Sequence, residues 1–282
     1  MGRFDGIIKG IERLASESQD VHAAIIIGSQ AREDHPSDDS SDLDVILIVG
    51  DTAHYLKDDR WLENIGGLQI SFLEKTIGGA TERRILFEGA LDVDFIIMTE
   101  EDLKSLFSRK ALNGIFGRGY KILVDKIGLE GLNEAPLQAK ANKLSEQEFL
   151  NLVNDFFYHT VWTAKKLKRG EMWTAKLCLD SYMKFLLLQM IECHALALHG
   201  EDYDIWHSGR FIEEWAESWI IKELSVCFAH FEESDIKEAL FNTMSLFRAV
   251  AKEAAQMMAY TYPNKADEFA SAWVSDYLEK RL

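Results

Sequence analysis

The sequence predicts an α+β protein in which a domain of strands and helices is followed by an all-α domain. Short apolar runs rich in β-branched residues recur up to residue 124 and are typical of strands. From Ser145 onward these runs give way to long segments with helical periodicity. The chain of 282 residues is longer than most single domains, so we expect two, residues 1–143 and residues 144–282.

The first half contains strands and helices in mixed order. Apolar residues recur at helical spacing over residues 3–17, and acidic residues follow the capping Thr99 at the start of a predicted helix over 100–109. A further helix is expected over 52–64 and a Gly-rich loop over 113–119. The predicted strands cover residues 22–27, 43–49, 68–73, 84–87, 91–98 and 120–124.

The composition changes near residue 127. Residues 127–143 mix Gly, Pro, Asn and Lys and are typical of a linker. Ser145 and Glu148 form a capping-box pattern that opens a predicted helix over 146–168. Helical periodicity continues over 171–199, 209–229, 234–260 and 265–280, which predicts a bundle.

Composition limits the classes of function. The net charge is −16, and no stripe of Lys and Arg suited to a nucleic-acid duplex is present, so we expect no nucleic-acid partner. No apolar run reaches the length of a membrane span, and the N-terminus lacks the apolar core of a signal peptide. The three cysteines form no CxxC motif and are expected to be reduced core residues of a cytoplasmic protein. The sequence carries no signal for the oligomeric state.

Two carboxylates stand at the start of the second strand. Asp42 and Asp44 are two residues apart and therefore share a strand face, while Leu43, Val45 and Leu47 point the other way into a core. Adjacent carboxylates repel each other and are costly to desolvate. Oxygen ligands in such a pair suit Mg²⁺, although the same residues could be loop and capping residues.

A possible anion contact precedes this pair. Gly28 and Ser29 follow an apolar strand, and a glycine turn lets backbone N–H groups and a hydroxyl approach a phosphate. Arg32 could add a positive charge. On its own, a Gly-Ser pair after a strand is usually only a turn.

A third acid is offered by the strand over 91–97. Asp92 and Asp94 share one face of it, and either could complete a cluster with Asp42 and Asp44. Three carboxylates on neighbouring strands can hold two Mg²⁺ ions for an in-line displacement at phosphorus. The pattern lacks the glycine and the final glutamate of a calcium loop, and no Walker loop, GxSxG or HExxH motif is present.

Together these pieces resemble the nucleotidyltransferase superfamily, whose members have a small mixed β-sheet with two metal-binding aspartates and a third aspartate. The resemblance extends over nearly the whole chain to the aminoglycoside 6-adenylyltransferases, the streptomycin-adenylylating enzymes. The stretches that carry it are residues 28–32, 162–171, 175–176, 206–211 and 260–263. Gln30 departs from relatives that have Arg there, which puts one additional phosphate contact in doubt.

The resemblance implies roles for the residues of the first half. Gly28, Ser29 and Arg32 would bind the triphosphate of ATP, and Asp42 and Asp44 would bind Mg²⁺. Asp94 matches the third acid best, because it lies between apolar neighbours; it would be the general base and a further metal ligand. Asp92 on the same strand face stays an alternative.

In the second half the assignments are more open. The resemblance implies that Lys165 contacts an ATP phosphate, although a cation near a helix C-terminus also complements the helix dipole. Lys176, Asp180 and Lys184 recur every four residues and could form either an exposed ladder of charges or one wall of the active site, with a lysine facing phosphate. Acidic and aromatic residues could bind a cationic aminocyclitol. The candidates for contacts to the acceptor are Glu171, Lys176, Asp180, Trp206 and His207.

The sequence therefore predicts an Mg²⁺-dependent enzyme that transfers AMP from ATP to an aminoglycoside. The resemblance implies the 6-hydroxyl of streptomycin as the acceptor and antibiotic resistance as the result. One alternative is a nucleotidyltransferase with another small molecule or a protein side chain as acceptor. Another is a non-catalytic nucleotide-binding or antitoxin-like module, against which the intact set Asp42, Asp44 and Asp94 argues.

Overall fold

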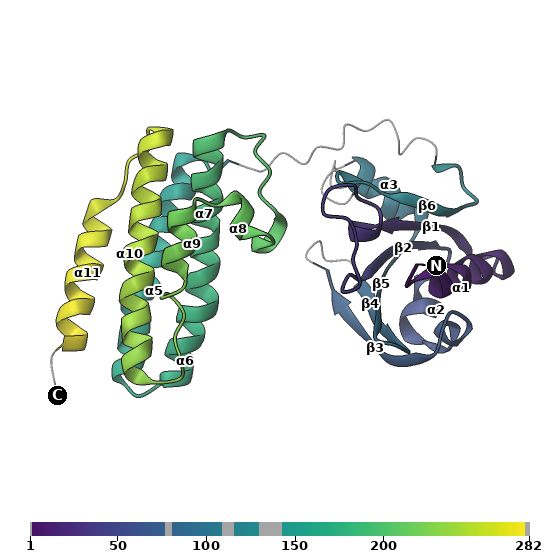
Figure 1. Cartoon of the computed structure of the whole chain (residues 1–282), viewed down its shortest axis with the longest axis horizontal. Coiled ribbons are helices and arrows are strands. Elements are labelled where there is room, and N and C mark those ends of the chain that lie inside the picture. Colours follow the sequence, from purple (N-terminus) through teal and green to yellow (C-terminus); the bar gives the residue numbers. More distant parts are fainter. Residues whose placement is uncertain (1, 77–80, 109–115, 130–142, 280–282) are drawn as a thin grey trace. The chain divides into compact units, whose positions relative to one another are not determined.

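The computed structural model describes residues 2–76, 81–108, 116–129 and 143–279. The chain forms two compact units, Met1–Ala139 and Lys140–Leu282 (Figure 1). The predicted α+β class is confirmed, since the first unit contains a mixed six-stranded sheet with helices and the second is helical.

The sheet of the first unit has the order β3-β4-β5-β2-β1-β6. Its central pair, β2 and β5, is parallel, and the other neighbours are antiparallel. The described strands are β1 (Val21–Ile27), β2 (Leu43–Val49), β3 (Leu68–Lys75), β4 (Thr81–Phe87), β5 (Leu91–Met98) and β6 (Lys121–Asp125). All six strands expected from the sequence are present among these residues.

Two hydrophobic cores cover the two faces of this sheet. On one face, α1 (Asp5–Glu17) and α2 (Thr52–Lys57) pack with the short 3-10 turn η2 (Arg60–Asn64) over Leu43, Val45 and Leu47. On the other face lies α3 (Glu100–Ser108) (Figure 1). Its Leu103 belongs to one core with Ile46 and Ile48 of β2. The alternation of β2 side chains between these cores buries the strand on both faces, as its apolar run predicts.

The expected helix over 52–64 is interrupted. Helix α2 ends at Lys57 and η2 begins at Arg60, because the Asp58 side chain accepts hydrogen bonds from the backbone and the guanidinium of Arg60. A carboxylate that bonds a backbone N–H two residues ahead favours a turn over a continuous helix. The Gly-rich loop predicted over 113–119 lies partly outside the described residues.

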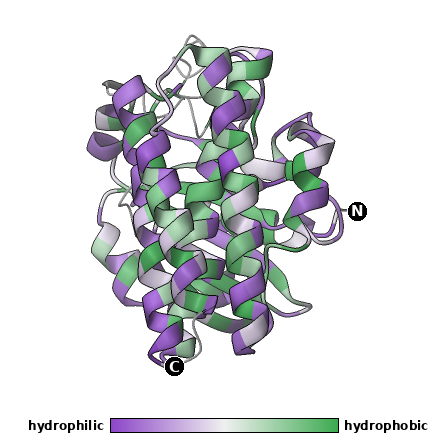
Figure 2. Cartoon of the chain, turned by 90° about the vertical axis from the view of Figure 1, so that its left-hand side faces the viewer, coloured by the Kyte–Doolittle hydropathy of each residue, from purple (hydrophilic) through white to green (hydrophobic). Residues whose placement is uncertain are grey.

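The second unit is a bundle of helices around one core. Helix α5 (Glu146–Lys168) begins at the predicted capping box, in which Ser145 and Glu148 bond to each other's backbone N–H groups. Phe156 of α5 stacks on Phe247 with ring centroids 3.7 Å apart. The other helices are α6 (Met172–Leu177), α7 (Met183–His199), α8 (Ile212–Trp215), α9 (Ser218–Leu224), α10 (Glu233–Met258) and α11 (Asn264–Glu279). Hydrophilic and hydrophobic residues lie side by side on the helices that face the viewer in Figure 2, as expected of amphipathic helices.

Two of the predicted helical segments are divided. Between α6 and α7 the chain forms a π-helical turn, Cys178–Tyr182, so the segment over 171–199 is not one regular α-helix. The segment over 209–229 contains only the short α8 and α9, because Ser208, Gly209 and Phe211 adopt positive φ angles before α8 and Ala216 is extended after it. Apolar periodicity cannot reveal such breaks, since both halves still bury one face.

Candidate active site

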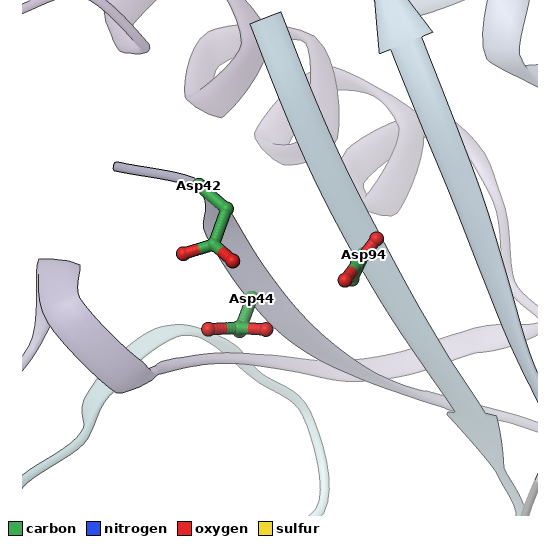
Figure 3. Close-up of side chains that lie close together, drawn as sticks. All are labelled: Asp42, Asp44 and Asp94. Carbon is green, nitrogen blue, oxygen red and sulfur yellow. The ribbon is translucent and has the colours of Figure 1, made fainter. Parts of the chain in front are cut away.

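Three carboxylates meet at one point of the sheet. Asp42 immediately precedes β2, Asp44 lies within β2, and Asp94 lies directly opposite Asp44 on the parallel strand β5. Each supplies one oxygen to a group whose atoms all lie within 4.8 Å of one another (Figure 3). The register of β2 and β5 therefore brings together the three acids singled out from the sequence.

This donor set fits a hard divalent cation. Carboxylate oxygens from two strands converge, and Mg²⁺ prefers oxygen ligands. Without a cation or another positive group, three negative charges so close together would repel one another strongly. Asp42 and Asp44 are half-buried and Asp94 is buried, so the cluster is partly shielded from water.

Asp94 has the most distinctive environment of the three. Its relative exposure is 4%, and this burial raises the pKa of its carboxyl group. Two hydrogen bonds from Arg84 oppose that shift: Nε donates to Oδ1 at 3.0 Å and Nη2 donates to Oδ2 at 2.8 Å. The nearby charges of Asp92 and Asp42 add to the upward shift.

Asp92 does not belong to the three-acid cluster among the described residues. It lies opposite Leu86 of β4, two positions from Asp94 on the same strand. The geometry thus favours Asp94 over Asp92 as the third acid of the site.

Gly28 is packed against the cluster. Its φ is +68°, a conformation that glycine adopts without strain. A Cβ at this position would overlap Oδ2 of Asp44, so the absence of a side chain lets the turn reach the carboxylate. Gly28 opens the 3-10 turn η1 (Gly28–Gln30), which follows β1 directly.

The rest of the turn is tied to the start of β2. The Ser29 hydroxyl and the Gln30 amide both lie 3.4 Å from the carbonyl oxygen of Asp42, to which they donate. Arg32 Nε donates to the carbonyl of His35 at 2.7 Å. Gln30 thus has a structural contact beside the acids.

Sequence reasoning missed two basic residues of this region. Arg84 pairs with Asp94, and Lys121 of β6 donates to the carbonyl of Gln30 at 2.6 Å. Neither belongs to a motif, because each reaches the site only through the pairing of its strand. A correct strand register would have been the signal for Arg84, which lies opposite Asp94 on β4.

Comparison with known proteins identifies the family of the chain. The family model described as streptomycin adenylyltransferase matches residues 2–280. The chain belongs to the streptomycin adenylyltransferase family. It is therefore a nucleotidyltransferase by family, and the resemblance drawn from its motifs is confirmed.

Curated relatives of the family match over most of their length. The chain is 22% identical to an aminoglycoside 6-adenylyltransferase of Bacillus subtilis over 259 residues, which covers 89% of each chain. It is 24% identical to one of Staphylococcus aureus, covering 92% of this chain and 93% of that one. A crystal structure of an aminoglycoside 6-adenyltransferase from Bacillus subtilis aligns with a TM-score of 0.46 at 18% identity, covering 98% of this chain and 97% of that chain.

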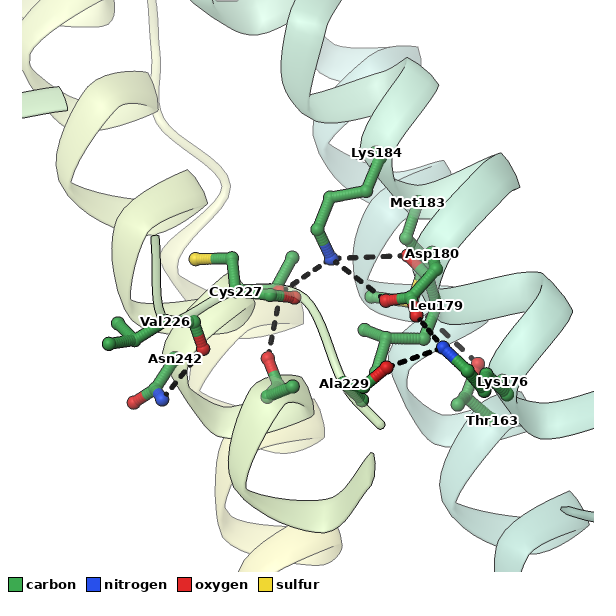
Figure 4. Close-up of polar contacts among 12 residues, drawn as sticks. Thr163, Lys176, Leu179, Asp180, Met183, Lys184, Val226, Cys227, Ala229 and Asn242 are labelled. Atoms are coloured by element: carbon green, nitrogen blue, oxygen red, sulfur yellow. Dashed lines mark hydrogen bonds and ion pairs between the residues drawn. The ribbon is translucent and has the colours of Figure 1, made fainter. Parts of the chain in front are cut away.

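The helical half of this family member contains the charged row predicted over residues 176–184. Lys176 pairs with Asp180 and donates to the carbonyl of Ala229 at 2.6 Å (Figure 4). Lys184 donates to Thr243 Oγ1 at 2.9 Å and to the carbonyl of Leu179. The row is therefore not an exposed ladder, because its side chains bind other helices and loops.

The Lys184 ammonium group is largely removed from water. Its side chain is 10% exposed, and burial lowers its pKa to about 8. Asp180 lies 3.8 Å away and opposes this shift, and the Phe228 ring lies 5.0 Å from the ammonium nitrogen. The prediction that Lys184 contacts a nucleotide phosphate stays a prediction.

The remaining candidates of the helical unit have different environments. Lys165 is exposed, with its ammonium 5.2 Å from the ring centre of Trp273. Glu171 binds Lys166 at 2.6 Å and Arg169 at 2.5 Å. These charges partly neutralise one another at the end of α5.

Trp206 and His207 are neighbours with opposite exposure. Trp206 is 7% exposed and packs edge-on against Phe211 in the helical core, whereas His207 is exposed and bonds to Ser208. Their assignment as acceptor contacts stays a prediction. No helix among residues 2–76, 81–108, 116–129 and 143–279 is long and apolar enough to cross a membrane.

Proposed function

We propose that this chain is an Mg²⁺-dependent adenylyltransferase that transfers AMP from ATP to a hydroxyl group of an aminoglycoside. The cluster of Asp42, Asp44 and Asp94 in a member of this family carries the proposal. The family name points to streptomycin as the acceptor. The curated relatives are named aminoglycoside 6-adenylyltransferases, which points to the 6-hydroxyl as the site of transfer. Such a transfer would confer resistance to the antibiotic.

Asp42 and Asp44 would hold Mg²⁺, with Asp94 completing the set. When bound, the cation would neutralise charge on the phosphates as it develops during transfer. Gly28, Ser29 and Arg32 would contact the triphosphate from the turn beside these acids, and Lys165 and Lys184 are the predicted nucleotide contacts of the helical unit. We expect the cluster to bind two Mg²⁺ ions, and a metal titration can test this number.

Asp94 would act as the general base. It accepts the proton of the acceptor hydroxyl at a carboxylate oxygen, while the hydroxyl oxygen forms a bond to the α-phosphorus of ATP. The bond from that phosphorus to the bridging oxygen breaks, and pyrophosphate leaves with the electron pair. Burial raises the pKa of Asp94, which strengthens it as a base, and Arg84 keeps it ionised before the reaction.

A transfer assay tests the proposal. The protein is incubated with ATP, Mg²⁺ and one aminoglycoside at a time, and pyrophosphate release and addition of an adenylyl group to the antibiotic are both measured. Turnover with streptomycin is the expected result. Adenylylation of another small molecule or of a protein instead would show that streptomycin is not the acceptor. Absence of any transfer with intact metal binding would favour a non-catalytic module.

Four asparagine variants test the acids. Asp42→Asn, Asp44→Asn and Asp94→Asn should each lower kcat by about 10²–10³-fold, the usual effect of removing one electrostatic group from an active site. Asp92→Asn is the matched control on the strand that carries Asp94. Full activity of Asp94→Asn together with loss of activity in Asp92→Asn would reverse the choice of the third acid.

A further inference from the structure

The guanidinium of Arg84 contacts both carboxylate oxygens of Asp94, one acid of the cluster. Arg84 of β4 lies opposite Asp94 of β5 in register, and Asp94 in turn lies opposite Asp44 of β2. The three residues thus form one row across three neighbouring strands. The row places a permanent positive charge on the far side of Asp94 from Asp44.

The contact between the two side chains is bidentate. Nε of Arg84 is 3.0 Å from Oδ1 and Nη2 is 2.8 Å from Oδ2 of Asp94. A planar guanidinium that binds both oxygens fixes the plane of the carboxylate as well as its position. Asp94 therefore cannot rotate toward a cation without breaking at least one of these bonds.

Arg84 also has partners toward the edge of the sheet. Its Nη1 donates to Glu74 Oε2 of the edge strand β3 at 3.1 Å. Oε1 of Glu82 on β4 lies 4.0 Å from Nε of Arg84. The Arg84 side chain is 36% exposed, whereas that of Asp94 is 6% exposed. The arginine thus spans from the open edge of the sheet to the buried acid.

We propose that, in the reaction proposed above, Arg84 is the positioning residue of Asp94 and separates its role from that of Asp42 and Asp44. Arg84 holds the Asp94 carboxylate in a fixed plane, and its charge weakens the attraction of Asp94 for a divalent cation. Metal binding then depends mainly on Asp42 and Asp44. Asp94 keeps an oxygen lone pair for the proton of the acceptor.

The Asp94 carboxylate has enough acceptor positions to bind Arg84 and still accept a proton. An ionised carboxylate has about four acceptor positions, of which Arg84 occupies two. The others remain for a cation or for the proton of a hydroxyl. A positive charge beside Asp94 disfavours a bound cation by Coulomb repulsion, whereas it acts little on the neutral hydroxyl group that approaches Asp94. The same charge also lowers the proton affinity of Asp94, so Arg84 serves the reaction through the fixed orientation of the carboxylate.

Metal binding to the full-length, metal-free protein gives a readout independent of turnover. Mn²⁺ is titrated into wild type and Arg84→Gln, with calorimetry or the paramagnetic signal of free Mn²⁺ as the measure. Removal of the positive charge should tighten Mn²⁺ binding by about 3–10-fold. At saturating metal, kcat should fall by about 10–100-fold, the typical effect of losing a residue that orients an active-site group.

Tighter Mn²⁺ binding together with a lower kcat distinguishes a residue that positions Asp94 from one that only stabilises the fold. A residue that only stabilises the sheet would, when replaced, weaken metal binding and turnover together. Glu74→Gln is the matched control, because it removes a partner of Arg84 at the exposed edge and leaves the pair with Asp94. It should change both quantities by less than about twofold, as expected for an exposed ion pair.

Arg84→Lys separates the effect of the charge from that of the bidentate geometry. It also provides the test if Arg84→Gln does not fold. It keeps the positive charge but cannot bind both oxygens in one plane. Mn²⁺ affinity should then stay near that of wild type while kcat falls. Unchanged kcat in Arg84→Lys, or unchanged or weaker Mn²⁺ binding in a folded Arg84→Gln, would overturn the proposal.

The test also separates this inference from the proposed function. Absence of AMP transfer by the wild-type protein would refute the proposed reaction. The Mn²⁺ titrations would still decide whether the Arg84 charge controls metal binding at the cluster, since they need no substrate.

Discussion

At the scale of single residues, the site depends on a backbone position that has no side chain. Gly28 combines a φ of +68° with direct contact to the Asp44 carboxylate. The first property costs any other residue about 1–3 kcal/mol, and the second prevents even a methyl group from fitting without moving Asp44. Gly28 is therefore expected to determine where the acids lie as well as to form the turn.

Gly28→Ala tests this expectation against a matched glycine. Gly89 has a φ of +79°, but a Cβ there would meet nothing within 4 Å. Both alanine variants should lose about 1–3 kcal/mol of stability through backbone strain, measured by chemical unfolding. Only Gly28→Ala should also weaken Mn²⁺ binding and lower kcat, by about tenfold or more, because Asp44 must shift. Equal activity of the two variants would contradict the role given to Gly28.

Lys184 gives a prediction in the alkaline range. Burial lowers its pKa to about 8 in the folded protein, against about 10.4 in an unfolded chain. Between these values the unfolded chain binds one more proton than the folded one, so stability rises with pH. From pH 7.5 to 9.5 wild type should gain about 2 kcal/mol relative to Lys184→Met.

Chemical unfolding of both proteins across this pH range measures the difference. Lys222→Met is a suitable control, because Lys222 is an exposed lysine of α9. A constant difference between wild type and Lys184→Met would show that Lys184 keeps an ordinary proton affinity.

The acids of the site could be predicted from the sequence because each stands at a strand position with a fixed face. Asp42 and Asp44 follow from the alternation at the start of one strand. The alternation of another strand offers both Asp92 and Asp94, and the family resemblance made the choice between them. Arg84 could not be found in this way, because its partner is set by which strands pair and in which register. The burial of Trp206 likewise follows from packing between helices that no local pattern specifies.

At the scale of elements, strands and long helices were predictable and their interruptions were not. Helix α5 has a local start signal in Ser145 and Glu148, and the structure confirms it. The π-helical turn at Cys178–Tyr182 and the short helices α8 and α9 have no such signal. A π turn changes the bonding of a few backbone groups without changing which face is apolar, so periodicity still favours a continuous helix.

A buried carboxylate links α10 and α11. Asp267 of α11 is 4% exposed and accepts hydrogen bonds from Arg248 of α10, Tyr262 and Ser271. Burial raises the pKa of Asp267, but the hydrogen bonds from Arg248, Tyr262 and Ser271 together lower it below its usual value. The ionised form is therefore favoured by folding.

Asp267→Asn should reduce stability near neutral pH by about 1–3 kcal/mol, because a hydrogen-bonded charge is removed. The contribution of Asp267 is present above the pKa of the unfolded chain, about 3.9, and is lost as pH falls through its lower folded value. The difference from wild type should thus shrink below about pH 4. Thermal unfolding from pH 7 to pH 3 measures it, with Glu268→Gln, an exposed neighbouring carboxylate, as the control. A difference that is independent of pH would contradict this account.

At the scale of the whole molecule, the two compact units have separate cores. The core of the helical unit is formed by residues from Phe149 to Val274, and the two cores of the first unit flank its sheet. Asp42, Asp44, Asp94, Arg84 and Gly28 all lie in the first unit. Their mutual contacts therefore need no residue of the helical unit.

This arrangement predicts that the metal site survives separation of the units. A fragment of residues 1–142 should fold and bind Mn²⁺ within about threefold of the full-length affinity, since the charges that set this affinity are retained. A fragment of residues 143–282 should be helical by circular dichroism and should not bind Mn²⁺ at the same concentrations. Neither fragment alone is expected to transfer AMP, because the predicted nucleotide and acceptor contacts Lys165, Lys176 and Glu171 belong to the helical unit. A folded 1–142 fragment that fails to bind Mn²⁺ would show that the helical unit contributes a ligand to the cation.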